Sequence, residues 1–318
     1  MTEWVQILVL ALIQGITEFL PVSSSAHLIL PAQIWGWVDQ GLMFDVAVHA
    51  GTLCAVLWYF RDTLIRLAKS ILPGGPSDQS ELWALVVATV PVVLAGLLFR
   101  DVIASDARAV NVIVLTTLLF GVLLGVADRL SRRGAGHTGP VSLRDALLIG
   151  LAQMFALIPG TSRSGVTITA ALFLGYHPAA AARFSFLLSV PVIGGAVVMM
   201  LATMGSGESS LSGGAALTAF GLSAMFAYAT IKAFMYWVGR IGLMPFVLYP
   251  NQVLKATNNP LEDALETGEK AKISAQKNLL KVRNKFLSRA IQAGHFNTPE
   301  VKPTKVPRKA SHRVCIAI

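Results

Sequence analysis

Long apolar stretches in the first 250 residues decide what this chain can fold into. A bilayer core about 30 Å thick is crossed by roughly 20 consecutive apolar residues in a helix. Segments that meet this requirement lie at about 44–60, 82–99, 111–127, 184–205 and 215–239. Backbone polar groups must pair with each other in hydrocarbon, so such segments are helical. The sequence therefore predicts an all-α, polytopic membrane protein.

Two further apolar regions are interrupted. Residues 4–38 and 146–175 each contain an apolar run, a proline with a cluster of small hydroxyl residues, and a second apolar run. Each run is too short to cross the bilayer comfortably. We expect each region to form a re-entrant helix–break–helix hairpin, which enters the membrane and returns on the same side.

The basic residues are distributed unevenly. Residues 251–318 hold 13 of the 26 Lys and Arg but only 5 of the 17 Asp and Glu, so this basic polar tail carries +8 of the net charge of +9. Residues 1–250, the expected membrane domain, are nearly neutral. A nearly neutral body does not attract nucleic acid, so no nucleic-acid partner is expected.

Basic residues in the short loops predict the orientation. One side has only Arg100 and Arg108. The other side has Arg61, Arg66, Lys69, Arg129, Arg132, Arg133, Arg144, Arg183 and Arg240. Basic loops face the cytoplasm. The first hairpin is therefore expected to open to the outside and the second to the inside.

An internal repeat relates the two hairpins. FLPVSSSAH (19–27) superposes on LIPGTSRSG (157–165), which aligns Pro21 with Pro159 and Ser24 with Ser162. Because the two copies are expected to enter from opposite sides, we predict two inverted-topology repeats. In such folds the broken helices meet near the bilayer midplane and form the site there.

Polar residues around the first break are candidates for chemistry. Glu18 follows Gln14 by four residues, so both side chains share a helix face. An ionisable group at membrane depth is a functional candidate by default, although a carboxylate at the membrane interface is the alternative. Ser24 and His27 follow within ten residues and add a nucleophile and a proton-transfer group, unless the serines only cap the next helix.

The second break, PGTSRSGVT (159–167), places Arg163 in the apolar body. A guanidinium stays charged and its donors suit phosphate oxygens, so it needs an anion there. Ser162, Ser164 and Thr167 add hydroxyl donors, and Gly160 allows close approach of the backbone. The N-terminus of the next helix also favours phosphate. A purely structural ion pair between Arg163 and Glu18 is the alternative.

These residues resemble the undecaprenyl-diphosphate phosphatase family, also called the bacitracin-resistance protein family. The family pattern of Glu or Gln, three residues and Glu matches Gln14 and Glu18, and FLPVSSSAH follows it. The family pattern PGxSRSxxT matches 159–167 without a break. The resemblance extends from about residue 1 to LMPFVLYP at 243–250.

The resemblance implies a bacterial inner-membrane (plasma-membrane) enzyme whose site opens to the periplasmic face. Such an enzyme hydrolyses undecaprenyl diphosphate to undecaprenyl phosphate and inorganic phosphate, which recycles the lipid carrier for cell-wall synthesis and confers bacitracin resistance. The resemblance also implies a divalent cation, Mg²⁺ or Ca²⁺, held by Glu18 and Gln14. Arg163 would bind the diphosphate, Ser24 or His27 would be the nucleophile, and His27 or Glu18 would transfer protons.

The C-terminal part departs from the family. The family continues after LYP into one more apolar transmembrane helix, whereas this chain continues into the basic polar tail, residues 251–318. A lipid-phosphate transporter or flippase is the alternative function, because inverted repeats with broken helices are also a transporter design. The expected partner is the lipid substrate, and a homodimer is left open.

Overall fold

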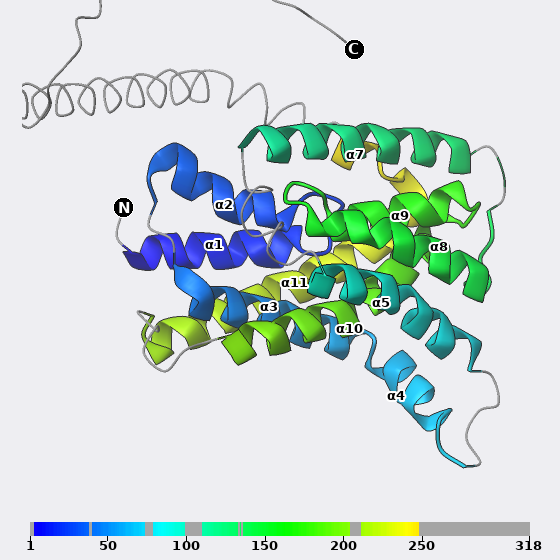
Figure 1. The fold of residues 1–318 in the computed structure, drawn as a ribbon, viewed down its shortest axis with the longest axis horizontal. Coiled ribbons are helices and arrows are strands. Elements are labelled where there is room, and N and C mark those ends of the chain that lie inside the picture. The colour runs from blue at the N-terminus through cyan, green and yellow to red at the C-terminus, as the bar shows by residue number, and fades with distance from the viewer. Residues whose placement is uncertain are drawn as a thin grey trace, which may run out of the picture. The chain divides into compact units, whose positions relative to one another are not determined.

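The computed structural model describes residues 3–37, 40–73, 79–98, 110–132, 134, 136–203 and 211–247, and its regular elements are helices (Figure 1). In chain order they are α1 (Glu3–Thr17), α2 (Ser24–Trp35), α3 (Gly41–Tyr59), α4 (Arg61–Lys69), α5 (Ser80–Leu98), α7 (Val110–Ser131), α8 (Leu143–Gln153), the 3-10 helix η1 (Met154–Leu157), α9 (Arg163–Phe173), α10 (Pro178–Thr203) and α11 (Gly213–Ile241). The all-α prediction is confirmed for the described residues. The basic polar tail lies outside them.

The long helices match the predicted apolar segments. Among the described residues, α3, α5, α10 and α11 are long and apolar enough to cross a membrane. The segment predicted at 111–127 lies within α7, which has 22 residues. Large apolar side chains point outward from these helices, and Leu98, Leu115 and Leu217 are 76%, 67% and 70% exposed. A surface this rich in exposed apolar groups suits hydrocarbon rather than water, so the chain is a membrane protein.

Two pairs of shorter helices are each separated by a break in the helical backbone. α1 and α2 lie on the left of Figure 1, α8 and α9 lie on the right, and the breaks between them face each other. Ser23 caps α2 by accepting the N–H of Ala26 at 3.3 Å, and Ser162 caps α9 by accepting the N–H of Gly165 at 3.2 Å. The sequence superposition aligned Ser24 with Ser162, so the two caps differ from it by one residue.

Small residues allow α11 to pack closely against α3 and α1. A Cβ on Gly51 of α3 would lie 2.4 Å from the Phe220 carbonyl oxygen, and one on Gly15 of α1 would lie 2.7 Å from the Ser223 carbonyl oxygen. Such small residues are typical of helix contacts in membranes, where backbones approach each other closely. This packing holds the first broken pair against the long helices.

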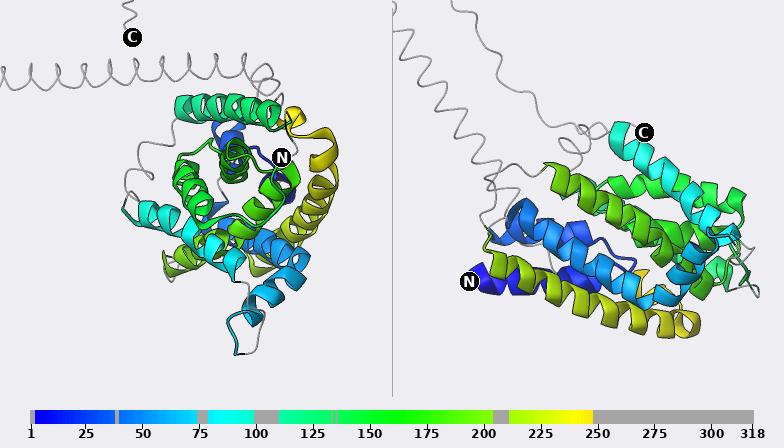
Figure 2. Two further views of the ribbon diagram at one scale, coloured as in Figure 1. Left: turned by 90° about the vertical axis from the view of Figure 1, so that its right-hand side faces the viewer. Right: turned by 90° about the horizontal axis from the view of Figure 1, so that it is seen from below.

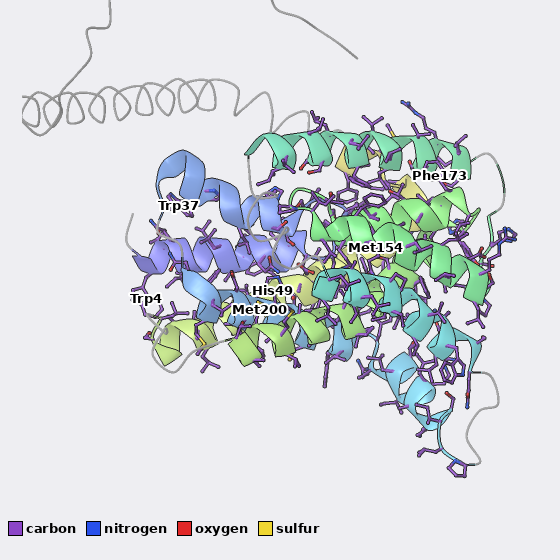
Figure 3. All side chains as sticks on the ribbon, viewed as in Figure 1. Trp4, Trp37, His49, Met154, Phe173 and Met200 are labelled. Atoms are coloured by element: carbon purple, nitrogen blue, oxygen red, sulfur yellow. The ribbon has the colours of Figure 1, made fainter. Side chains whose placement is uncertain are left out.

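Polar contacts gather at the end of the bundle where α7 and α11 finish and α5, α8 and α10 begin. Glu81 binds both Arg66 and Arg183 there. Tyr176 donates a hydrogen bond to Asp145 at 2.8 Å, and burial raises the pKa of the Tyr176 hydroxyl. Trp4 and Trp37 lie at the other end, where α1 begins (Figures 1 and 3). Among the described residues, ion pairs and polar contacts are therefore concentrated at this end of the bundle.

Candidate active site

Glu18 lies at the point where the two breaks meet. It follows the end of α1 and is 9% exposed. Its Oε2 accepts hydrogen bonds from Gln14 Nε2 and from Ser24 Oγ, both at 2.9 Å. Its Oε1 accepts from Arg163 Nη2 at 3.2 Å. One buried carboxylate thus joins α1, α2 and α9.

Arg163 is the first residue of α9, and its guanidinium contacts three residues. In addition to its bond with Glu18, the guanidinium donates from Nη1 to the carbonyl oxygen of Ser185 on α10 at 3.1 Å. Its Cζ lies 6.0 Å from the centroid of the buried Phe19 ring, within cation–π range. Only 12% of the Arg163 side chain is exposed. A buried cation of this kind needs an anion, which Glu18 supplies.

The hydroxyl groups of the second break tie it to the first. Ser164 Oγ donates to the Leu20 carbonyl oxygen at 2.7 Å, and Ser162 Oγ donates to the same oxygen at 3.4 Å. Thr167 donates to the Arg163 carbonyl oxygen at 2.9 Å and shares a hydrogen bond of 2.7 Å with Ser185 Oγ. The three hydroxyls that the sequence indicated as phosphate donors therefore all form hydrogen bonds within the protein, to Leu20, to the Arg163 carbonyl oxygen and to Ser185.

Gly160 is required by its contact with α7. Its φ is +89°, and a Cβ there would lie 2.3 Å from Thr116 Oγ1 and 2.4 Å from the Ile113 carbonyl oxygen. The Gly160 carbonyl oxygen also accepts from Thr117 Oγ1 at 3.0 Å. Sequence analysis attributed this glycine to close approach of a phosphate, and the structure gives a second reason, which is the close approach of α7.

Ser24 and His27 lie on the first turn of α2, and both are half-buried. The Ser24 hydroxyl donates to Glu18, so the base within hydrogen-bond reach of this serine is a carboxylate. His27 Nδ1 lies 2.6 Å from the Ser23 carbonyl oxygen. A carbonyl only accepts, so the proton of a neutral His27 is assigned to Nδ1.

The donor set around Glu18 fits a divalent cation that is shared with a phosphate. Gln14 is fully buried, and its Oε1 has no hydrogen-bond partner among the described residues. This oxygen and the Glu18 carboxylate are hard donors of the kind that Mg²⁺ and Ca²⁺ prefer. The described residues contain no group of three His, Cys, Asp or Glu side chains that could hold a metal ion. A cation here would therefore need substrate oxygens to complete its shell, as is common for Mg²⁺.

An apolar groove of about 490 Å³ adjoins the site between α1 and α11. Leu20, whose carbonyl oxygen accepts from Ser164, is one of its lining residues. Phe234 lines it further along and packs on Phe186 with ring centroids 5.4 Å apart. Phe186 in turn packs on Phe19 at 5.3 Å. A continuous set of aromatic rings therefore connects this groove with the ring next to Arg163.

Sequence reasoning missed two of these contacts. It gave neither Ser185 nor Phe19 a role at the site. The available signals were a small polar residue within the apolar segment FSFLLS and an aromatic residue directly after Glu18. Neither signal reveals a contact with Arg163, because that contact depends on α10 lying beside α9.

The comparisons with known proteins agree with these motifs. Residues 7–253 match the family described as Bacitracin resistance protein BacA. A protein of Hahella chejuensis named undecaprenyl-diphosphatase is 53% identical over 255 residues, which cover 77% of this chain and 94% of that protein. Proteins of the same name from Teredinibacter turnerae (51% over 255 residues, 78% and 95% covered) and Alteromonas mediterranea (47% over 249 residues, 77% and 93% covered) are also similar. The family match ends at residue 253, near the start of the basic polar tail.

Proposed function

Because the chain belongs to the bacitracin resistance protein family, we propose that it is an undecaprenyl-diphosphatase, which hydrolyses undecaprenyl diphosphate to undecaprenyl phosphate and inorganic phosphate. This reaction recycles the lipid carrier for cell-wall synthesis and accounts for bacitracin resistance. The observation that carries the proposal is the buried contact of Arg163 with Glu18 and, through it, with Ser24. It combines an anion-binding cation, a base and a nucleophile.

Arg163 binds the diphosphate in this proposal. Phosphate oxygens take the place of the Glu18 carboxylate on the guanidinium, whose planar donors suit them. The N-terminus of α9 adds backbone N–H groups and a partial positive charge. Ser162, Ser164 and Thr167 lie at the same end of α9, and their hydrogen bonds orient this end of the helix. In phosphoryl transfer the protein mainly positions groups and neutralises charge, and this arrangement supplies both.

Ser24 is the nucleophile that the contacts favour, and His27 is the alternative. The Ser24 oxygen attacks the terminal phosphorus while Glu18 takes the hydroxyl proton. The bond from that phosphorus to the bridging oxygen breaks, and undecaprenyl phosphate leaves. Water then hydrolyses the phosphoserine, releases inorganic phosphate and restores the serine. His27 lies on the same turn of α2 and is the second group that transfers protons in this proposal.

Glu18 and the Gln14 carbonyl oxygen would hold the divalent cation. A bound Mg²⁺ or Ca²⁺ neutralises charge on the phosphate oxygens. The carboxylate thus has two tasks, as a ligand and as the acceptor of the Ser24 proton. The Gln14 amide nitrogen keeps Glu18 oriented through its bond of 2.9 Å.

The two broken helix pairs are re-entrant hairpins of two inverted repeats in this proposal. Their breaks contact each other, as the bonds from Ser162 and Ser164 to Leu20 support. Residues 1–250 form the membrane domain in the inner membrane, residues 251–318 form a cytoplasmic tail, and the site opens to the periplasmic face. The groove between α1 and α11 receives part of the prenyl chain, since it adjoins Leu20.

Loss of either charge of the central pair tests the proposal. We expect Arg163→Ala and Glu18→Ala each to lower kcat by about 10²–10³ or more, because each removes charge stabilisation at the reacting phosphate. Phosphate release is measured with purified protein in proteoliposomes that contain undecaprenyl diphosphate. Arg129→Ala is the matched control, because Arg129 is exposed in the last turn of α7 and does not line the groove between α1 and α11.

Near-normal turnover by either variant, with membrane insertion verified, would contradict the assignment. The same proteoliposomes separate hydrolysis from transport. Phosphate release without movement of the substrate across the bilayer supports the enzyme. Movement without release supports the transporter or flippase.

A further inference from the structure

A second apolar groove, of about 610 Å³, lies between α4, α5 and α10. Its walls include Leu64 and Leu67 of α4, Leu82 and Leu94 of α5, and Leu187 and Pro191 of α10. None of its lining residues belongs to the candidate active site or to the groove between α1 and α11. The reaction proposed above gives this second groove no role.

Charged side chains mark one end of this groove. Arg66 lies between Leu64 and Leu67 on α4, Glu81 immediately precedes Leu82, and Arg183 lies one turn before Leu187. Arg66 Nη2 donates to Glu81 Oε2 at 2.8 Å, and Arg183 donates to the other carboxylate oxygen. The side chains of Arg66 and Arg183 stay 49% and 38% exposed, while that of Glu81 is 12% exposed. Two cations share one anion, so a positive charge remains to bind a further anion.

The short helix α4 has the character of an interfacial helix. Figure 1 and the left view of Figure 2 show it at the edge of the bundle, beside α5. Arg61, Arg66 and Lys69 lie on it, yet Ile65 is 51% exposed and Ile71, just beyond its end, is 65% exposed. A helix that presents both basic and apolar groups lies at the boundary between lipid headgroups and acyl chains.

The length of the groove fits one leaflet of a bilayer. Its walls extend along α5 from Leu82 to Leu94, which corresponds to about 18 Å of helix. The hydrocarbon of one leaflet is about 15 Å thick, half of the bilayer core. With the charged cluster at the headgroup level, the groove therefore follows an acyl chain from its headgroup toward the bilayer centre.

We propose that this groove is a binding site for an anionic phospholipid. One acyl chain lies between α5 and α10, and the lipid phosphate binds the exposed donors of Arg66 and Arg183. Basic pockets between membrane helices bind anionic headgroups in this way. The cluster lies at the basic end of the bundle, where anionic lipids of the cytoplasmic leaflet would meet it.

Two variants separate the headgroup contact from the chain contact. Val90→Trp fills the groove and leaves the charges in place, because Val90 lines the groove two turns beyond Leu82. Arg66→Gln removes one cation and leaves Arg183 paired with Glu81. Leu97→Trp is the matched control, because Leu97 lies on the same helix, is 64% exposed and does not line the groove.

The test titrates dioleoylphosphatidylglycerol or dioleoylphosphatidylcholine into the purified full chain in detergent, and native mass spectrometry measures the bound lipid. We expect the wild type and Leu97→Trp to bind the anionic lipid more tightly than the zwitterionic one. Arg66→Gln should lower affinity for the anionic lipid about fivefold, the effect of one basic residue at a membrane surface. Val90→Trp should weaken binding of both lipids.

Equal affinity of the wild type for the two lipids would overturn the proposal, as would wild-type affinity in Val90→Trp. The melting temperature of each variant shows whether it is folded. If Val90→Trp does not fold, the comparison of Arg66→Gln with the wild type still decides the headgroup contact, and an unchanged lipid preference overturns the proposal. The readout is binding, so it stands apart from the outcome for undecaprenyl diphosphate hydrolysis.

Discussion

Glu18 accepts hydrogen bonds from Gln14, Ser24 and Arg163, which belong to three different helices. A buried carboxylate loses its hydration, and each of these donors offsets part of that cost. Removal of any one donor therefore changes the surroundings and the orientation of the carboxylate on which the other two depend. The effects of single substitutions at these positions should not add up.

The choice between Ser24 and His27 as nucleophile is testable. We expect Ser24→Ala to abolish turnover and the trapped phosphoenzyme, because the hydroxyl bound to Glu18 is the group that attacks phosphorus. His27→Ala should lower turnover but still form the phosphoenzyme. Acid quenching with labelled substrate, followed by measurement of phosphate bound to the protein, checks this. A phosphoenzyme in Ser24→Ala that is absent in His27→Ala would reverse the roles.

The side chain at position 14 should set the cation requirement. Gln14→Glu places a second carboxylate beside Glu18, and we expect the half-activating Mg²⁺ concentration to fall about tenfold, because affinity follows the number of charged ligands. Gln14→Leu removes the buried carbonyl oxygen and should raise that concentration. Phosphate release measured over a range of Mg²⁺ concentrations distinguishes the three proteins. An identical requirement in all three would show that position 14 is not a ligand.

At the scale of elements, the sequence predicted the positions of the two helix breaks well, but it did not predict which helices pack against them. Pro21 and the Pro159–Gly160 pair stop their helices, and the nearby serines cap the next ones, so local chemistry decides both breaks. The apolar segment predicted from about residue 184 belongs to α10, and this helix already begins at Pro178. The alanines between these positions favour a helix but add little to an apolar pattern.

The packing of α7 against the second break should contribute to the stability of the protein and, through the position of Arg163, to its activity. We expect Gly160→Ala to destabilise the protein by about 1–3 kcal/mol, because alanine is strained at positive φ and its Cβ would overlap Thr116. Activity should fall with the displacement of Arg163. Gly139→Ala is the control, since its Cβ would meet nothing within 4 Å. Thermal unfolding in detergent measures both, and equal melting temperatures would refute the role of α7.

At the scale of the whole molecule, the long helices and the membrane character follow from apolar length, whereas α4 was not predicted, because its residues Arg61, Arg66 and Lys69 were expected in a loop. The site depends on segments far apart in the sequence. Arg163 and Glu18 are separated by 145 residues and still form an ion pair of 3.2 Å. The internal repeat gave a reason to expect this meeting. It could not indicate the Ser185 carbonyl oxygen or the Phe19 ring, because neither belongs to a repeated pattern.

The proposed orientation predicts which surfaces water-soluble reagents reach. In a background without Cys54 and Cys315, a cysteine introduced by Gly139→Cys, at the charged end, should react only from the cytoplasmic side. Gly213→Cys, at the start of α11, should react only from the periplasmic side. Both glycines are exposed, and a Cβ there meets nothing within 4 Å. Labelling of intact cells and of inverted vesicles with a membrane-impermeant maleimide checks this, and the opposite pattern would invert the topology.

The ion pair between Arg163 and Glu18 also bears on how a reaction cycle ends. Any anion that binds the guanidinium must compete with a carboxylate that is tethered beside it. Orthophosphate, once cleaved from its lipid, has no hydrocarbon chain to add to its affinity, so this internal competitor favours its departure. Product inhibition is therefore expected to be weak, and turnover should continue while orthophosphate accumulates.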